Sequence, residues 1–114
     1  GLDVSDMAVA RAIAEGVGLA IALVNIQAPE RIAHWIDAFR EDIRPSLIMG
    51  IGVCLQAIIQ EDPAFEREIE AIEVPVLKGA LTKARGALKA TPVGMDWYYR
   101  CALYLRSSSE KAPL

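Results

Sequence analysis

The chain has 114 residues and a formal net charge of −3, and its residues are 54% hydrophobic but only 6% aromatic. This length suits one domain, because a chain of this size buries roughly two-thirds of its unfolded surface without disulfides or metals. The negative charge provides no overall field that would attract phosphate groups, so nucleic acid is not an expected partner. We expect a single helical domain over residues 1–106 and a disordered tail over residues 107–114.

Proline marks the predicted helix boundaries. Five prolines are each followed by apolar residues at helical spacing, which is typical of proline in the first turn of a helix. They are Pro29, Pro45, Pro63, Pro75 and Pro92. The pattern predicts helices over about residues 5–25, 29–43, 45–60, 62–74, 75–89 and 92–105. The expected fold class is therefore all-α, a compact bundle of about five or six helices that forms a homodimer.

The predicted first helix is apolar on nearly every side after Glu15, and such a helix is expected to be buried on all sides. Small residues four apart form two rows along it, and such rows let a neighbouring backbone approach closely. The rows are Ala8, Ala12, Gly16 and Ala20, and Ala10, Ala14, Gly18 and Ala22. The helix over residues 45–60 has the same character, so these two helices are predicted to form the centre. Four glycines are predicted to lie at a dimer contact or a close helix contact: Gly16, Gly18, Gly50 and Gly52.

The Gly-x-Gly pair and the proline that follows it recur 34 residues later, which suggests a duplicated helical hairpin. The tetratricopeptide pattern is absent, so the duplication stays a hypothesis. A phosphate-binding loop would need a third glycine and a preceding strand, and neither pair has them. Close helix packing is the preferred interpretation of both pairs.

Neither uncharged stretch, over residues 16–29 and 45–60, reaches the roughly 20 apolar residues of a membrane-spanning helix. Asp3, Asp6 and Glu15 make the N-terminal segment acidic, unlike the basic start of a secretory signal. We therefore expect a cytoplasmic chain that has no membrane partner.

No catalytic, cofactor-binding or metal-binding motif is recognisable. The single histidine, His34, shares a helical face with Glu30, Asp37 and Glu41, but carboxylate-bridged metal bundles need a Glu-x-x-His pair on each of two helices. We interpret this face as a solvated polar surface. Cys54 and Cys101 lack the short spacing of a metal or redox motif and are interpreted as reduced core thiols, although a bridge between them stays open.

The two helices before and after Pro75 carry opposite charge. The first is acidic and the second is basic, so an antiparallel pairing is expected to be favourable but weak. The basic residues are Lys78, Lys83, Arg85 and Lys89. A nucleic-acid-binding face is the alternative interpretation of this helix, and the acidic neighbour competes with it.

The predicted last helix holds most of the aromatic side chains: Trp97, Tyr98, Tyr99 and Tyr104. Trp and Tyr are frequent in binding hot spots, but these residues are equally suited to closing the core. Tyr99 and Leu103 are four residues apart and point away from the stripe that holds Trp97, so they are the predicted partner-binding anchors, with Trp97 and Tyr98 beside them.

Two nearly uncharged helices and an aromatic helix leave more apolar surface than the other helices can cover. The first hypothesis is therefore a protein-interaction module whose partners are a second copy of itself and a regulatory protein. The alternatives are a helical pocket for an apolar small molecule and a small DNA-binding regulator.

The chain also resembles small bacterial antiactivators, and most of all the quorum-sensing antiactivators of pseudomonads. The resemblance lies in its size, its all-helical pattern, the helix with Gly16-Val17-Gly18 and the segment Trp97-Tyr98-Tyr99. It implies a dimer that binds a LuxR-type transcription activator at the ligand-binding domain and prevents that activator from dimerising and binding DNA. It implies no enzyme activity and no cofactor.

Overall fold

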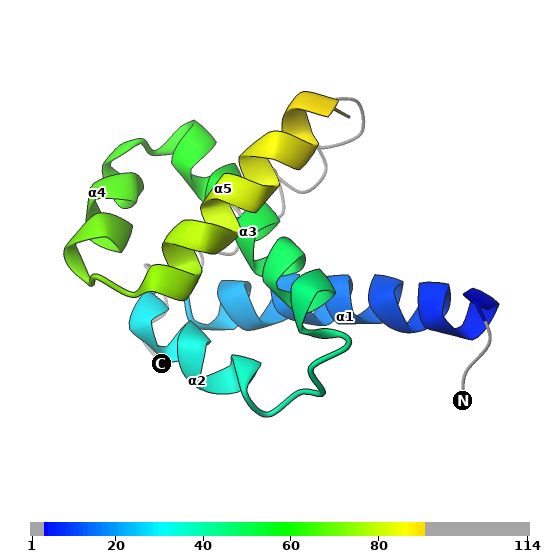
Figure 1. Ribbon diagram of the computed structural model, residues 1–114. Helices are drawn as coiled ribbons and strands as arrows, with labels where there is room; N and C mark the ends of the chain where they lie inside the picture. Colours follow the sequence, from blue (N-terminus) through cyan, green and yellow to red (C-terminus); the bar gives the residue numbers. More distant parts are fainter. Residues whose placement is uncertain (1–3, 91–114) are drawn as a thin grey trace.

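The computed structural model describes residues 4–90, and within them the side chains of residues 6–87 (Figure 1). This part of the chain forms five α-helices and one 3-10 helix. They are α1 (Val4–Val24), η1 (Pro29–Arg31), α2 (Ile32–Ile36), α3 (Arg44–Glu61), α4 (Ala64–Ala71) and α5 (Pro75–Ala90). The predicted all-α bundle is confirmed. The predicted helix over residues 92–105, the tail over residues 107–114 and Cys101 lie outside the described residues.

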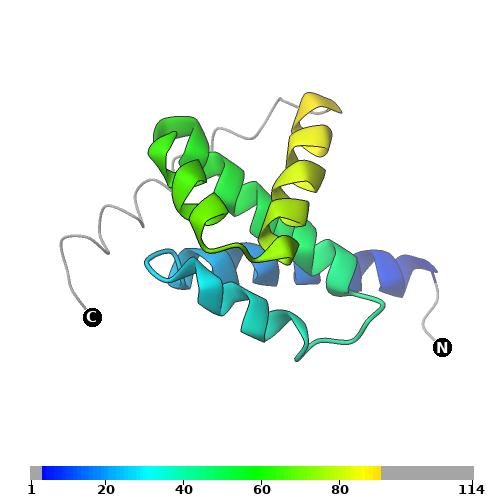
Figure 2. The ribbon, with the colours of Figure 1, turned by 60° about the vertical axis from the view of Figure 1, so that its left-hand side comes forward.

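The helix α3 is central, as the prediction for residues 45–60 required. It contacts α1 and α5 and crosses each of them at an angle (Figure 2). Every residue from 50 to 55 on α3 is buried, because neighbours cover the helix on several sides. The other helices add large apolar side chains to the same core, among them Ile32, Phe65, Ile69 and Leu77.

The crossings of α3 depend on three glycines. A Cβ atom on Gly18 would lie 2.0 Å from the carbonyl oxygen of Leu47, and one on Gly50 would lie 1.8 Å from that of Glu15. A Cβ on Gly52 would lie 2.1 Å from the carbonyl oxygen of Ala80. Gly18, Gly50 and Gly52 therefore make close helix contacts inside the subunit. Gly16 does not, since nothing lies within 4 Å of its Cβ position.

The prediction that α1 is buried on all sides is wrong. Of its two small rows, the one ending in Ala14, Gly18 and Ala22 is buried at those three positions. The other row is exposed at all four of its residues, Ala8, Ala12, Gly16 and Ala20. The two rows are offset by two residues, so they lie about 200° apart around the helix axis, on nearly opposite sides of α1. The bundle covers only the side of α1 that faces α3.

The helix predicted over residues 29–43 is much shorter than expected, because α2 ends at Ile36. The N–H groups of Ala38 and Phe39 donate to carbonyl oxygens three residues back, at 3.2 Å, which is a turn geometry. The Arg44 guanidinium donates to the carbonyl oxygens of Phe39 at 2.8 Å and of Asp37 at 3.3 Å. A side chain from α3 thus binds carbonyl oxygens of the turn that follows α2.

Candidate functional site

One side of α1 carries a continuous apolar strip, which we call the α1 outer face: Val9, Ala12, Ile13, Gly16, Ala20 and Val24. Spacings of three and four residues place these positions on one side of the helix, and none of them is charged. Val9, Ile13 and Val24 are 58%, 61% and 79% exposed. Among residues 6–87, Trp35 at 51% is the one other large hydrophobic residue with comparable exposure. Figure 1 shows that the N-terminal half of α1, which holds Val9 and Ile13, extends beyond the other helices. Ala20 and Val24 lie in the second half, on the side of α1 that is turned away from α3.

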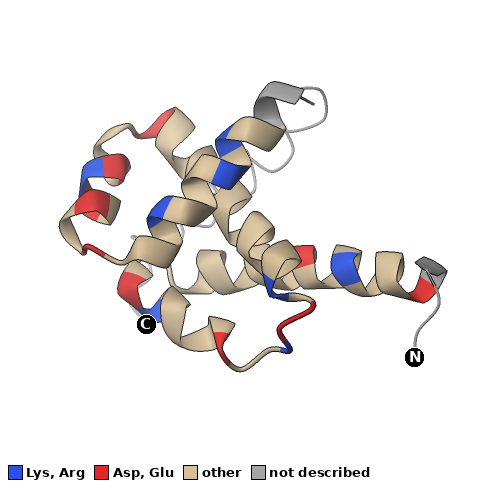
Figure 3. Ribbon diagram, in the orientation of Figure 1, with Lys and Arg blue, Asp and Glu red and all other residues tan. Residues whose placement is uncertain are grey.

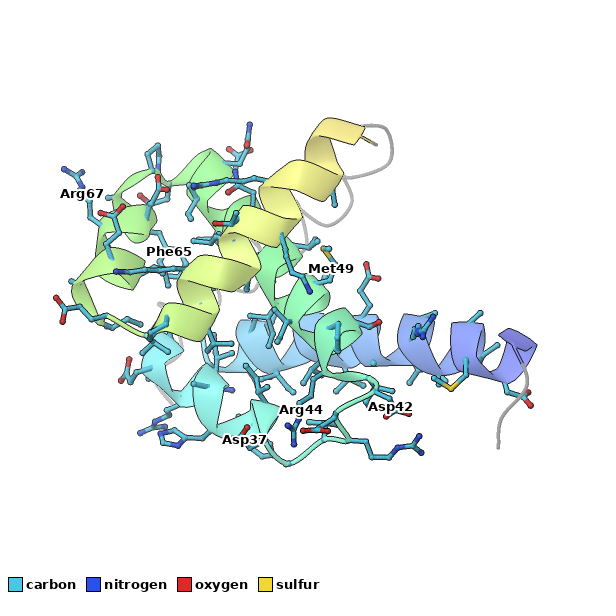
Figure 4. The ribbon with its side chains drawn as sticks, in the orientation of Figure 1. Asp37, Asp42, Arg44, Met49, Phe65 and Arg67 are labelled. Atoms are coloured by element: carbon cyan, nitrogen blue, oxygen red, sulfur yellow. The ribbon has the colours of Figure 1, made fainter. Side chains whose placement is uncertain are left out.

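An apolar groove of about 270 Å³ borders the α1 outer face, between the first half of α1 and the turn before α3. Its lining residues are Met7, Ala10, Ile13, Ala14, Val17, Phe39, Arg40 and Ile43. Ile13 belongs to both the groove and the outer face, so the two form one apolar surface. The far wall is fixed in place by the hydrogen bonds of Arg44 to the turn (Figure 4).

The charges at the rim of the groove are paired with each other. Arg40 Nε donates to Asp42 Oδ1 at 3.1 Å, and a second guanidinium nitrogen pairs with Asp42 Oδ2. The hydrogen bond from Arg40 lowers the pKa of Asp42, and the same bond raises the pKa of Arg40. The rim therefore adds little net charge to the apolar surface.

The stretch Asp6–Val24 of α1 is long and apolar enough to cross a membrane by length and composition alone, with a mean hydropathy of 1.8. The earlier prediction counted only residues 16–29 and found them too short. The longer stretch includes Arg11 and Glu15, both exposed, and 17% of it is buried in the bundle. The core helix of a water-soluble protein and a signal sequence meet the same criteria.

The charged surface of α4 and α5 has a different character (Figure 3). Acidic residues of α4 lie beside basic residues of α5, and Glu66 forms an ion pair with Arg85. Arg85 Nε also donates to Gln56 Oε1 on α3 at 2.8 Å. A cleft of about 370 Å³ lies between these helices, and its lining includes Lys78 as well as Glu66 and Arg85. The guanidinium of Arg85 is thus engaged within the subunit, which weakens the nucleic-acid interpretation of α5.

The polar residues that were considered for a metal site are exposed, and the cysteine in the described part of the chain is buried. Glu30, His34, Asp37 and Glu41 are all exposed. No group of three or more His, Cys, Asp or Glu residues in the described part of the chain is arranged to hold a metal ion. Cys54 is a free thiol in the core, and burial raises its pKa to about 12, which suppresses the reactive thiolate.

The predicted partner-binding residues Trp97, Tyr98, Tyr99 and Leu103 lie outside the described residues. Conversely, the sequence analysis missed Val9, Ile13 and Val24, which it assigned to a buried helix. The available signal was the absence of charge along their side of α1 from Val9 to Val24. That signal indicates an apolar side but not whether the same chain covers it.

No protein-family model matches the chain, and neither a curated protein nor a solved structure is significantly similar to it.

Proposed function

We propose that this chain is a protein-interaction module, which pairs with a second copy of itself and binds a regulatory protein. The observation that carries the proposal is the α1 outer face, where Val9, Ile13 and Val24 are each more than half exposed. Complete burial of a fully exposed side chain of this kind contributes about 1.5–3 kcal/mol, so burying the exposed part of these three residues favours association and offsets part of its entropic cost. Contiguous apolar patches on a folded surface commonly mark such contacts.

We further propose that the regulatory protein is a LuxR-type transcription activator, and that the chain inhibits it by blocking its dimerisation and DNA binding in the cytoplasm. The resemblance to quorum-sensing antiactivators supports this choice of partner. An inhibitor of this kind needs a surface that competes with the activator's own dimer contact, and it needs no catalytic group. Tyr99 and Leu103 are the proposed anchors, because Tyr is frequent in binding hot spots and Leu103, four residues later, is predicted to lie on the same side of the last helix.

A mobility-shift assay with a LuxR-type activator on its own DNA site tests this proposal. Adding the purified chain releases the DNA, and the variant with Tyr99→Asp and Leu103→Asp leaves the complex intact while its circular dichroism stays helical. Ala64→Asp is the matched control, because it adds the same kind of charge at an exposed position at the start of α4, outside the basic residues of α5, and it behaves like the wild type. A complex that survives an excess of the wild-type chain contradicts the antiactivator proposal. Release by the double variant contradicts the choice of anchors.

The groove beside Ile13 supports a second candidate, the binding of a small apolar molecule. Its volume of about 270 Å³ is just below the range of about 300–1,000 Å³ typical of pockets for drug-sized ligands. Native mass spectrometry of the purified chain tests this candidate directly. A bound apolar compound that is lost on Ile13→Asp supports it, and a ligand-free spectrum after purification without detergent counts against it.

A further inference from the structure

We propose that a second copy of the chain covers the α1 outer face, with the two α1 helices antiparallel and the two-fold axis beside Gly16. This inference rests on the proposed self-pairing and specifies its geometry. Its starting point is the separation of the two small rows of α1. The row with Ala14 and Gly18 is buried against α3 inside the subunit. The row with Ala12 and Gly16 is exposed.

The distribution of large and small residues along the strip favours the antiparallel direction. In the middle of the strip the large Ile13 lies on one side of Gly16 and the small Ala20 on the other, and Val9 and Val24 lie at the two ends. An antiparallel pair places Ile13 of one copy against Ala20 of the other, and Val9 of one copy against Val24 of the other. A parallel two-fold pair places each residue against itself, so that Ile13 meets Ile13 and a gap remains between the two Ala20 residues. Gly16 has open space at its Cβ position and lies at the axis, where it lets the helices approach closely.

The strip alone is too small for a stable interface, so the proposed dimer also uses the groove. A helix of 21 residues is about 31 Å long and about 10 Å wide, so each copy offers a flat strip of roughly 300 Å². Two strips together fall short of the roughly 1,000 Å² that a specific interface buries. Contact beyond the strip is therefore needed for a stable dimer.

The antiparallel arrangement supplies this contact through Val24, the most exposed large hydrophobic residue on the described surface. Val24 lies eleven residues after Ile13, and eleven residues are almost three full helical turns, so the two side chains project from α1 within about 20° of each other. Ile13 lines the groove, so both residues lie on the edge of α1 that borders it. A two-fold axis across antiparallel helices brings the same edge of each helix together, so Val24 of one copy lies over the groove lined by Met7 and Ala10 of the other.

The charges on α1 favour a protein occupant over a lipid bilayer. Arg11 and Glu15 lie on the other side of the helix from the strip, and both are exposed. A second copy covers the strip and leaves both charges in water. Insertion of α1 into a bilayer places both charges within the hydrocarbon region, where ionised side chains are strongly disfavoured.

Disulfide cross-linking tests the geometry. The variants Ile13→Cys and Ala20→Cys are each made in a Cys101→Ser background, since the buried Cys54 thiol, with a pKa of about 12, does not compete. Cα atoms must lie within about 7 Å for a disulfide to form. An equimolar mixture of the two variants therefore forms the linked dimer at least ten-fold faster than either variant alone. Gly79→Cys on α5, which is exposed, is the control and stays unlinked.

Each other outcome overturns the inference in a recognisable way. Linking within each single variant, with no gain in the mixture, shows parallel pairing. A dimer by sedimentation that does not link in the mixture shows self-pairing through another surface, so the proposed function stands while this inference fails. A monomer at all concentrations rejects both this inference and the proposed self-pairing, and flotation of that monomer with phosphatidylcholine vesicles assigns the strip to a membrane.

Discussion

Gly18, Gly50 and Gly52 let three helices meet through their backbones, since a Cβ at any of them would overlap a carbonyl oxygen of the neighbouring helix. Backbone atoms cannot rotate away as a flexible side chain does. We predict that Gly50→Ala lowers the free energy of unfolding by about 1–3 kcal/mol or more, the usual effect of overpacking a core. Gly79→Ala is the matched control, because its Cβ has open space and alanine favours the helix by about 0.8–1 kcal/mol. Urea unfolding at one fixed protein concentration measures both, and equal effects of the two substitutions contradict the packing described for α1 and α3.

Cys54 provides a pH-dependent prediction at the same scale. Burial raises its pKa from 9.0 to about 12, so the folded chain keeps the proton more tightly than the unfolded chain. The contribution of this thiol to stability is complete below pH 9 and is lost as the pH rises towards 12, at up to about 1.4 kcal/mol per pH unit. At pH 9 a disulfide reagent should modify native Cys54 on the order of 100-fold more slowly than the unfolded chain, in a Cys101→Ser background. Equal rates at low denaturant concentration contradict the burial of this residue.

Between elements, Arg85 is the clearest polar connection, because it joins α5 to Gln56 on α3 and to Glu66 on α4. The side chains of Arg85 and Glu66 are 41% and 35% exposed, so water screens their attraction. A double-mutant cycle with Arg85→Ala and Glu66→Ala should give a coupling free energy below about 1 kcal/mol, and the coupling should shrink at high salt. A coupling of several kcal/mol that is independent of salt contradicts this description.

The elements also show which sequence signals were sufficient. The apolar pattern and the prolines located α3 and α5 closely, because local preference and burial agree there. They failed for residues 37–43, where the pattern continues as a helix but Arg44 from the next element binds the turn instead. They also failed for the outer side of α1, because periodicity locates an apolar side and does not tell whether the partner belongs to the same chain.

For the whole molecule, the distribution of apolar surface is the main finding. Within residues 4–90 the bundle buries most of α3 and leaves the α1 outer face and the adjoining groove uncovered. The sequence analysis identified the surplus of apolar surface and both rows of small residues, but it predicted α1 to be buried on all sides and so did not find that one row is exposed. It did not identify Ile13 or Val24 as part of a site, since their exposure depends on which side of α1 the other helices cover in the folded chain.

Sedimentation equilibrium of the purified chain over a range of concentrations tests the central claim most directly, that the α1 outer face binds another protein surface, beginning with a second copy. The account predicts a mass that rises with concentration from the monomer value of 12.4 kDa towards the dimer. It also predicts that Ile13→Asp stays monomeric at every concentration while Lys83→Glu dimerises like the wild type. A wild-type chain that is monomeric throughout, or an Ile13→Asp variant that dimerises as well as the wild type, contradicts the claim.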